Sequence, residues 1–196
     1  MNKYIPLLLL AMVSFLSANP VMAWSVTNHH DIAEDTYYSL PVDMQENLNL
    51  STMVDGSDDP DTQFLDFKYH VYPYNLQKAK YWLNEGKTNY QDGDYNYSSY
   101  CYGVATHYIS DGLCGPHFES GSSRTYHALY EVRALLLKPK ITYYSGDLDS
   151  VFQQNHLKTK KSWKNWLKQG DDVNIQNDLD RAGSTSYSAV FNSIKG

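Results

Sequence analysis

Two histidine–carboxylate pairs constrain this chain more than any other feature of its sequence. His107 and Asp111 stand four residues apart in HYISD, and His127 and Glu131 repeat that spacing in HALYE. On an α-helix, positions i and i+4 share one face and lie about 6 Å apart, so both side chains can reach one cation. Imidazole nitrogen and carboxylate oxygen are the ligands of a catalytic zinc that has no thiolate. The pairs therefore predict two helices that present ligands to a metal ion.

The rest of the chain also carries helical periodicity. Apolar residues recur at helical spacing over 29–40, 75–85, 98–111 and 123–137, and more weakly over 160–168 and 174–194. Ser98 or Ser99 is a candidate cap for the third of these helices and Ser123 for the fourth. Residues 47–69 are rich in Asp, Gly, Ser and Pro and are predicted to form a loop. Because no segment sustains strand alternation, we predict an all-α fold, a single-domain multi-helix bundle.

The N-terminus has the pattern of an export signal. Lys3 precedes an apolar stretch over residues 5–16, and Val21-Met22-Ala23 follows as a small-residue exit. The alternative, an uncleaved membrane anchor, is disfavoured because a span needs about 20 apolar residues. We predict a signal peptide over 1–23, a mature domain over 24–196 that begins with Trp24, and a secreted or extracytoplasmic location.

Composition excludes several classes of protein. The formal net charge of −6 disfavours a general nucleic-acid binder, which needs a basic surface. Two cysteines are too few for a disulfide scaffold. Cys101 and Asp111 would lie about 15 Å apart along one helix, and Cys114 follows three residues later. A disulfide needs Cα atoms within about 7 Å, so we predict that the two cysteines do not pair.

Other candidate ligands flank the two pairs. His117 follows a Gly-Pro turn between them, and His70 and the segment GSDDPD lie upstream. Taken singly, a His-x-x-x-carboxylate pair is more often a surface pair, and the run Asp58, Asp59, Asp61 is most simply a solvated turn. The whole order, Trp, His, Asp, His, His-x-x-x-Asp, His, His-x-x-x-Glu, is far more demanding. Helices with inward-facing ligands are a known way for a bundle to build a metal site.

This order resembles the zinc-dependent phospholipase C and single-strand-specific nuclease superfamily, which is all-helical and exported. The similarity runs from Trp24 to about Glu131, and its most specific block is HYISDGLCGPH. WSVTNH matches the start of the mature chain and favours His29 over His30 as the first histidine ligand. The segments GSDDPD and KYHVYP supply Asp61 and His70.

The resemblance implies a cluster of three zinc ions. One ion would be held by Asp61, His70, His107 and Asp111. A second would be held by His117, His127 and Glu131. A third would be held by the amine and carbonyl of Trp24, by His29 and by a bridging Asp111. Glu131 at the last position resembles the phospholipase branch rather than the nuclease branch.

The implied activity is hydrolysis of phosphodiesters by a zinc-activated water, of phospholipase C type, on a phospholipid or another phosphoester. Asp61 would also orient or deprotonate the attacking water. Two alternatives stay open: a single-strand nuclease or nucleotidase of the same superfamily, and a non-catalytic zinc-binding surface protein. We expect a monomer, and no nucleic-acid partner unless the nuclease alternative holds. The sequence assigns no role to residues 140–196.

Two weaker features concern the C-terminal region. Five lysines surround Trp163 and Trp166: Lys158, Lys160, Lys161, Lys164 and Lys168. The simpler interpretation is a surface helix with two buried tryptophans, and the alternative is a peripheral membrane contact with anionic head groups. His156 has no partner at ligand spacing and is predicted to be a surface histidine.

Overall fold

The computed structural model describes residues 24–118 and 124–196, and these residues form helices and no strand. The predicted signal peptide over 1–23 and the predicted Ser123 cap lie outside the described residues. The α-helices are α2 (Val26–Ser39), α3 (Val42–Asn47), α4 (Leu50–Asp59), α5 (Tyr74–Asp92), α6 (Tyr95–Asp111), α7 (Arg124–Ala134), α8 (Leu148–Gln169) and α9 (Asp172–Lys195). The prediction of an all-α fold is confirmed.

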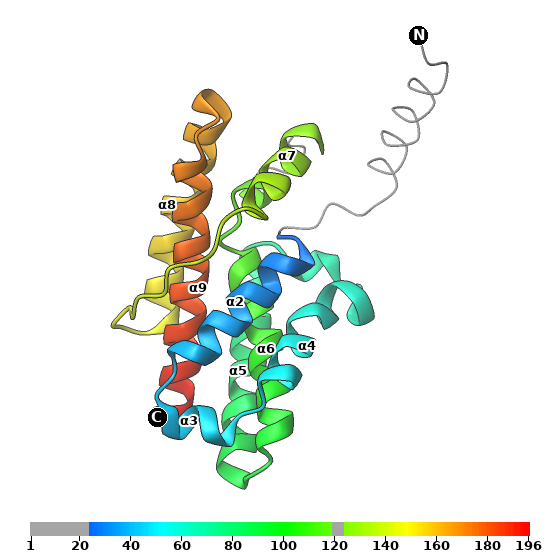
Figure 1. The fold of residues 1–196 in the computed structure, drawn as a ribbon, viewed down its shortest axis with the longest axis vertical. Coiled ribbons are helices and arrows are strands. Elements are labelled where there is room, and N and C mark those ends of the chain that lie inside the picture. Colours follow the sequence, from blue (N-terminus) through cyan, green and yellow to red (C-terminus); the bar gives the residue numbers. More distant parts are fainter. Residues whose placement is uncertain (1–23, 119–123) are drawn as a thin grey trace.

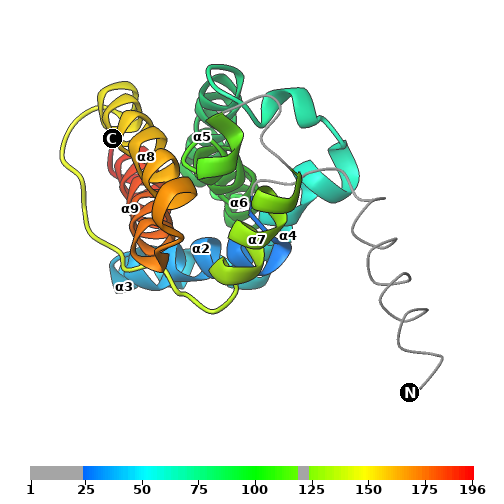
Figure 2. The same ribbon diagram turned by 90° about the horizontal axis from the view of Figure 1, so that it is seen from above.

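Helix α6 is the centre of the bundle. It packs against α2, α4, α5 and α9, and its residues from Ser98 to Asp111 are nearly all buried. Helices α5 and α6 form an antiparallel pair, and α8 and α9 form a second pair beside them (Figures 1 and 2). The C-terminal end of α6, the N-terminal ends of α2 and α5, and all of α7 lie at the upper end of the bundle in Figure 1. That end therefore collects the segments that carry the predicted ligands.

The prediction of a loop over residues 47–69 is wrong. Most of this segment is helical: α4 is followed by a π-helical turn, η1 (Pro60–Phe64), and a 3-10 turn, η2 (Phe67–Tyr69). Asn49 caps α4 by accepting a hydrogen bond from the Thr52 amide. The small and polar residues that suggested a loop serve close packing instead, because a Cβ at Gly56 would lie 2.4 Å from the Tyr100 carbonyl oxygen of α6.

Other helices begin earlier than the sequence predicted. Asp94, not Ser98 or Ser99, caps α6 by accepting a hydrogen bond from the Tyr97 amide. Ser98 and Ser99 are buried within the helix, where their hydroxyls donate to backbone carbonyls. Helix α8 begins at Leu148, twelve residues before the predicted start, with Asp147 as its cap. Buried serines such as Ser98 and Ser99 interrupt the apolar periodicity by which helix boundaries are predicted from sequence.

Two further predictions, about the cysteines and about the lysine-rich helix, are confirmed. Cys101 and Cys114 are free and buried, as predicted. Trp163 and Trp166 are buried while the five lysines of α8 are exposed, which confirms the simpler interpretation of that helix. Within the described residues, no helix combines the length and the apolar character that crossing a membrane requires.

We expect Gly103→Ala to destabilise the fold, although alanine is normally the better helix former by about 1 kcal/mol. A Cβ at this position would lie 1.9 Å from the Met53 carbonyl oxygen, so α4 and α6 would be forced apart. Overpacking of this kind costs about 1–3 kcal/mol. Chemical denaturation measures the free energy of unfolding, and a variant as stable as the wild type would contradict the close contact of the two helices.

Candidate metal centre

Five of the predicted ligands meet at the upper end of α6. His70 Nδ1 lies 2.6 Å from Asp111 Oδ2, and His107 Nε2 lies 3.3 Å from the same oxygen. The other Asp111 oxygen lies 3.3 Å from His29 Nε2. Asp61 Oδ1 completes the group, 3.5 Å from His70 Nδ1 and 3.9 Å from His107 Nε2. All five side chains are buried, and they come from four separate segments of the chain.

Backbone and hydroxyl groups orient the imidazole rings. His107 Nδ1 lies 2.7 Å from the Ser57 carbonyl oxygen, so it carries the proton and leaves Nε2 as a free lone pair. The close packing of α4 against α6 brings this carbonyl within reach. His29 Nδ1 lies 3.1 Å from Ser110 Oγ, and that hydroxyl donates to the His107 carbonyl oxygen. His29 Nε2 is therefore also directed, as a lone pair, at the cluster.

Asp61 and His70 reach the cluster from the segment that follows α4. Asp61 lies in the π-helical turn, a rare element that occurs frequently at functional sites. His70 follows η2 and contacts Asp66 through its other nitrogen, with 3.5 Å between Nε2 and Oδ1. Asp66 also accepts hydrogen bonds of 2.9 Å from the Tyr108 hydroxyl. A carboxylate behind a histidine ligand fixes the ring and raises its basicity.

The other histidine–carboxylate pair forms a second group beside the first. On α7, His127 Nε2 lies 2.9 Å from Glu131 Oε1. His117, in the 3-10 turn η3 (Gly115–Phe118), places its ring 5.7 Å from that of His127. His117 Nδ1 donates to the His70 carbonyl oxygen at 3.0 Å, which leaves Nε2 as the lone-pair nitrogen. This hydrogen bond joins the two groups of predicted ligands.

Trp24 is anchored next to the first group. Its ring is fully buried, and Nε1 donates to the Ser110 carbonyl oxygen at 2.9 Å. Ser110 precedes Asp111 and contacts His29, so the beginning of the described chain is held beside the cluster. The preference for His29 over His30 agrees with this geometry, because His30 is half-exposed and pairs with Asp58 instead.

Buried polar atoms that make no well-aligned hydrogen bond are concentrated in this site. Of the described residues, twelve buried side-chain nitrogen and oxygen atoms make no such hydrogen bond, and six belong to the predicted ligands: His29 Nε2, Asp61 Oδ1, His70 Nε2, both Asp111 oxygens and Glu131 Oε1. Their contacts are with one another and with Asp66 and His127. Buried polar atoms are normally satisfied. Two overlapping sets, His29–Asp61–His107 and His70–His107–Asp111, hold three donor atoms each within 4.8 Å of one another. Nitrogen and oxygen donors in this arrangement fit a zinc ion.

The protonation states also suit a cation. Burial, helped by His107, lowers the pKa of His29 to about 4, and burial lowers the pKa of His117 to about 4, so both are neutral donors at pH 7. Burial opposes ionisation of Asp111, but His107 and His70 outweigh it and hold its pKa well below the usual range. Burial would lower the pKa of His70, but Asp111 raises it to about 9. A metal ion must therefore displace the His70 proton to bind there.

A buried network supports the helix that carries His127 and Glu131. The Tyr130 hydroxyl donates to Asp178 Oδ2 at 2.5 Å, and Asp178 also pairs with Arg181. Arg181 in turn donates to Ser162 Oγ at 2.6 Å. The Tyr130 ring contacts Trp24, Trp163 and Trp166. Helices α8 and α9 thereby hold α7 from behind, a role that the sequence did not assign to residues 140–196.

Several supporting residues were not predicted from the sequence. Asp66 stands four residues before His70, the same spacing that revealed the other pairs, so it was detectable. The Ser57 carbonyl and the Tyr130–Asp178 contact join distant segments and leave no local signal. The prediction that His156 is a surface residue is wrong. Its ring is half-buried among aromatic rings, and Nδ1 contacts the Gly112 carbonyl oxygen at 2.8 Å.

The Asp58, Asp59, Asp61 run is not a solvated turn either. Asp58 pairs with His30 at 2.5 Å, and Asp59 accepts a hydrogen bond of 2.7 Å from the Tyr100 hydroxyl. Asp61 is buried in the cluster. Each carboxylate has a different neighbour because α4 and the π-helical turn that follows it rotate successive side chains onto different faces.

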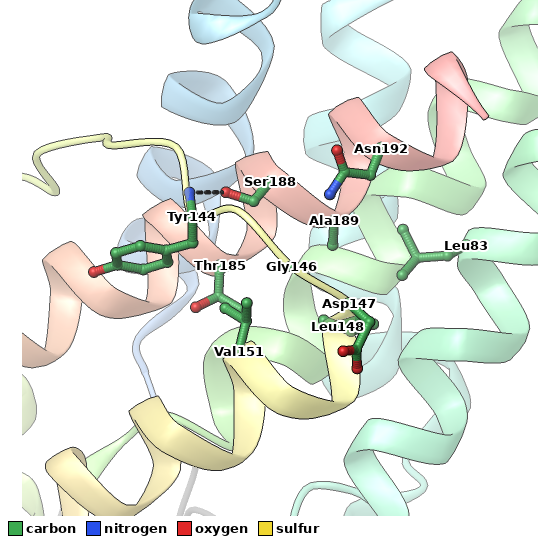
Figure 3. Close-up of a pocket in the computed structure, with 10 residues that line it drawn as sticks. All are labelled: Leu83, Tyr144, Gly146, Asp147, Leu148, Val151, Thr185, Ser188, Ala189 and Asn192. Atoms are coloured by element: carbon green, nitrogen blue, oxygen red, sulfur yellow. Dashed lines mark hydrogen bonds between the residues drawn. The ribbon is translucent and has the colours of Figure 1, made fainter.

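A cavity of about 140 Å³ lies away from this centre, at the N-terminal end of α8 (Figure 3). Leu83, Val151 and Ala189 line it, together with the turn that leads into α8. Its one carboxylate, Asp147, already accepts hydrogen bonds from Ser150 as the helix cap. Its lining contains no histidine or cysteine and no second carboxylate, so the candidate metal ligands of the described residues lie elsewhere, at the upper end of α6.

Comparisons with known proteins agree with this geometry. A family profile described as zinc-dependent phospholipase C matches residues 28–176, which is most of the chain. The matched range contains every predicted ligand except Trp24. Searches of the curated proteins and of the solved structures found no match.

We expect Tyr130→Phe to weaken zinc binding, because α7 would lose its hydrogen bond to Asp178 and with it the placement of Glu131. Loss of a supporting group typically lowers metal affinity about tenfold or more. Chelator competition, followed by the zinc content of the protein, measures the change. Tyr102→Phe is the matched control, since it removes a buried hydroxyl that contacts Ser193 in another part of the core. Equal zinc loss in both variants, or none in Tyr130→Phe, would contradict this role.

Proposed function

The chain belongs to the zinc-dependent phospholipase C family, and we propose that it is an exported phosphoesterase that hydrolyses phosphodiester bonds in the manner of a phospholipase C. The family supports a phosphoesterase-type function. The observation that carries the proposal is the concentration, at one end of α6, of buried nitrogen and oxygen atoms that make no well-aligned hydrogen bond. The phospholipase reading is favoured over the nuclease alternative by the family that matches.

The proposed ligand sets follow the two groups of side chains. Asp61, His70, His107 and Asp111 would hold one zinc ion. His117, His127 and Glu131 would hold a second. Contacts of 2.6–3.5 Å among the first set and of 2.9 Å between His127 and Glu131 support these two sets.

A third ion would be held by His29, Asp111 and the N-terminal amine and carbonyl of Trp24. Asp111 would bridge two ions, because its two oxygens face different histidines. The third set also requires that residues 1–23 be removed as a signal peptide, so that Trp24 carries a free amine.

The bound zinc ions would supply positive charge that polarises a phosphate ester and makes a water molecule more acidic. The side chains around the proposed ions have the protonation states that zinc ligands need. Asp111 stays ionised in a fully buried position, and His29 and His117 stay neutral and keep their lone pairs directed inward. Burial raises the pKa of Asp61 to about 6. We propose that Asp61 orients or deprotonates the attacking water as well as binding zinc.

We expect Asp111→Asn to impair the protein more than Glu131→Gln. Asp111 faces three histidines, and its substitution by Asn removes a negative charge that two proposed ions share. Glu131 faces one histidine and would hold one ion. The measurements are the zinc content of the chain starting at Trp24 and its hydrolysis rate on a water-soluble phosphodiester. The wild type should bind about three zinc ions and hydrolyse the substrate, and Asp111→Asn should lose most of both.

Equal or milder damage in Asp111→Asn would show that this carboxylate does not bridge two ions. A wild type that binds zinc but hydrolyses no phosphoester would favour the non-catalytic alternative. Activity on single-stranded nucleic acid, rather than on phospholipids, would favour the nuclease alternative.

A second prediction concerns the N-terminus. A chain with one or two extra residues before Trp24 has a peptide nitrogen there instead of an amine, and a peptide nitrogen does not bind zinc at neutral pH. A free α-amine has a pKa of about 7.7–8.0, from which zinc can displace the proton. We expect the extended chain to bind about one zinc ion fewer than the chain that starts at Trp24, and to lose most activity. Full zinc content in the extended chain would exclude Trp24 as a ligand.

A further inference from the structure

Exposed apolar side chains gather on the two segments that carry the outer ligands. Nineteen large hydrophobic residues of the described chain are exposed, and ten of them lie in two short stretches, 65–74 and 126–136. The first stretch contains His70 and the second contains His127 and Glu131. Scattered exposed hydrophobics are normal on a protein surface, but a contiguous patch marks an interaction site.

Helix α7 shows the pattern most clearly. His127, Tyr130 and Ala134 are buried on its inner face. Leu129 and Val132 lie three residues apart on the opposite face and are 46% and 57% exposed. Leu136, in the turn that directly follows α7, is 87% exposed. A helix that is apolar on both faces normally has something packed against each. The described residues leave about half of the Leu129 and Val132 side chains uncovered on the outer face of α7.

The first stretch, residues 65–74, lies on the other side of His117. Its exposed residues are Leu65, Phe67, Val71, Tyr72 and Tyr74. His117 contacts the His70 backbone at 3.0 Å, and its ring lies 5.7 Å from that of His127, so the stretches 65–74 and 126–136 flank the same group of ligands. Both lie towards the upper end of the bundle in Figure 1.

We propose that these two stretches form a membrane-docking rim, by which the protein rests on a phospholipid surface beside its metal centre. This inference rests on the proposed function. A phospholipid leaves a bilayer at a large cost, because each buried CH₂ contributes about 0.8 kcal/mol. An enzyme that acts on the phosphate of a lipid therefore avoids this cost by docking its active site on the bilayer surface. The residues that border the active site then contact lipid.

The chemistry of the rim suits that occupant. Tyrosine and phenylalanine beside leucine and valine are the side chains that enter the boundary between head groups and acyl chains. Lys68 is exposed within the first stretch, and Lys164 and Lys168 are exposed on the end of α8 that lies at the same end of the bundle as α7 (Figure 1). Cations in these places complement lipid phosphates. The rim is centred on the stretches 65–74 and 126–136 and takes in only Lys164 and Lys168 of the five α8 lysines that the sequence offered as an alternative membrane contact.

The test compares two double variants of the zinc-loaded chain that starts at Trp24. Val132→Ser with Leu136→Ser removes apolar area from the rim. Val42→Ser with Leu157→Ser is the matched control, one valine and one leucine that are 69% and 64% exposed on α3 and on the outer face of α8. Binding is measured by cosedimentation with phosphatidylcholine vesicles, with and without an anionic phospholipid. Hydrolysis is measured on the vesicles and on a water-soluble phosphodiester.

We expect the rim variant to bind vesicles about tenfold more weakly or worse, since each of the two side chains loses its apolar burial. Its hydrolysis of vesicle lipid should fall to a similar extent, whereas its rate on the soluble substrate stays at the wild-type value. The control should match the wild type in every measurement.

Equal vesicle binding by the rim variant and the wild type would overturn the inference, as would a loss of binding in the control alone. The inference would also be overturned if the wild type does not bind vesicles but self-associates, and the rim variant does not self-associate. That result would assign this face to a second copy of the chain. If the wild type hydrolyses neither substrate, the proposed function fails, while cosedimentation still decides whether the rim binds lipid.

Discussion

The buried carboxylate of Asp111 is the constraint on which the rest of the structure depends. It is fully inaccessible at the end of the most deeply buried helix, and it is held ionised by the histidines around it. A charge in such a place is costly unless it is paired. Three segments, α2, the turn before His70 and α6 itself, each bring a histidine to it. The upper end of the bundle is thus organised around one negative charge, and a cation is what completes it.

The second requirement is that each histidine ring be correctly oriented, and backbone carbonyls provide most of the hydrogen bonds that orient these rings. A histidine that binds a metal through one ring nitrogen almost always donates a hydrogen bond from the other, which fixes its tautomer and its orientation. In each case the Nδ1 atom has a hydrogen-bond partner: the Ser57 carbonyl for His107, the Ser110 hydroxyl for His29 and the His70 carbonyl for His117. Because helix packing fixes these partners, a substitution that shifts one helix against another is expected to move the ligands, even when it lies far from the cluster. The glycine contacts between α4 and α6 and the Tyr130–Asp178 hydrogen bond are two such routes.

The C-terminal helices make the centre possible without contributing a predicted ligand. α8 and α9 bury Trp163 and Trp166 against Tyr130, and through it they fix α7. With α7 held from its inner side, its outer side is left to face whatever approaches the site. The same short helix can therefore hold His127 and Glu131 inward and present Leu129 and Val132 outward, with Leu136 exposed in the turn that follows it. In the proposed enzyme this arrangement joins catalysis to the surface on which the substrate lies.

The sequence by itself determined the fold class and the order of the candidate ligands. Helical spacing is local, so His107 with Asp111 and His127 with Glu131 were identifiable from the positions four residues apart. The helical state of residues 50–64 was not, because Gly56 and the neighbouring polar residues favour a loop until α6 packs against them. Only the tertiary structure decided which nitrogen of each histidine faces inward, which carboxylates support the ligands from behind, and which apolar residues stay uncovered. Those features arise from contacts between segments distant in the chain, and no local pattern records them.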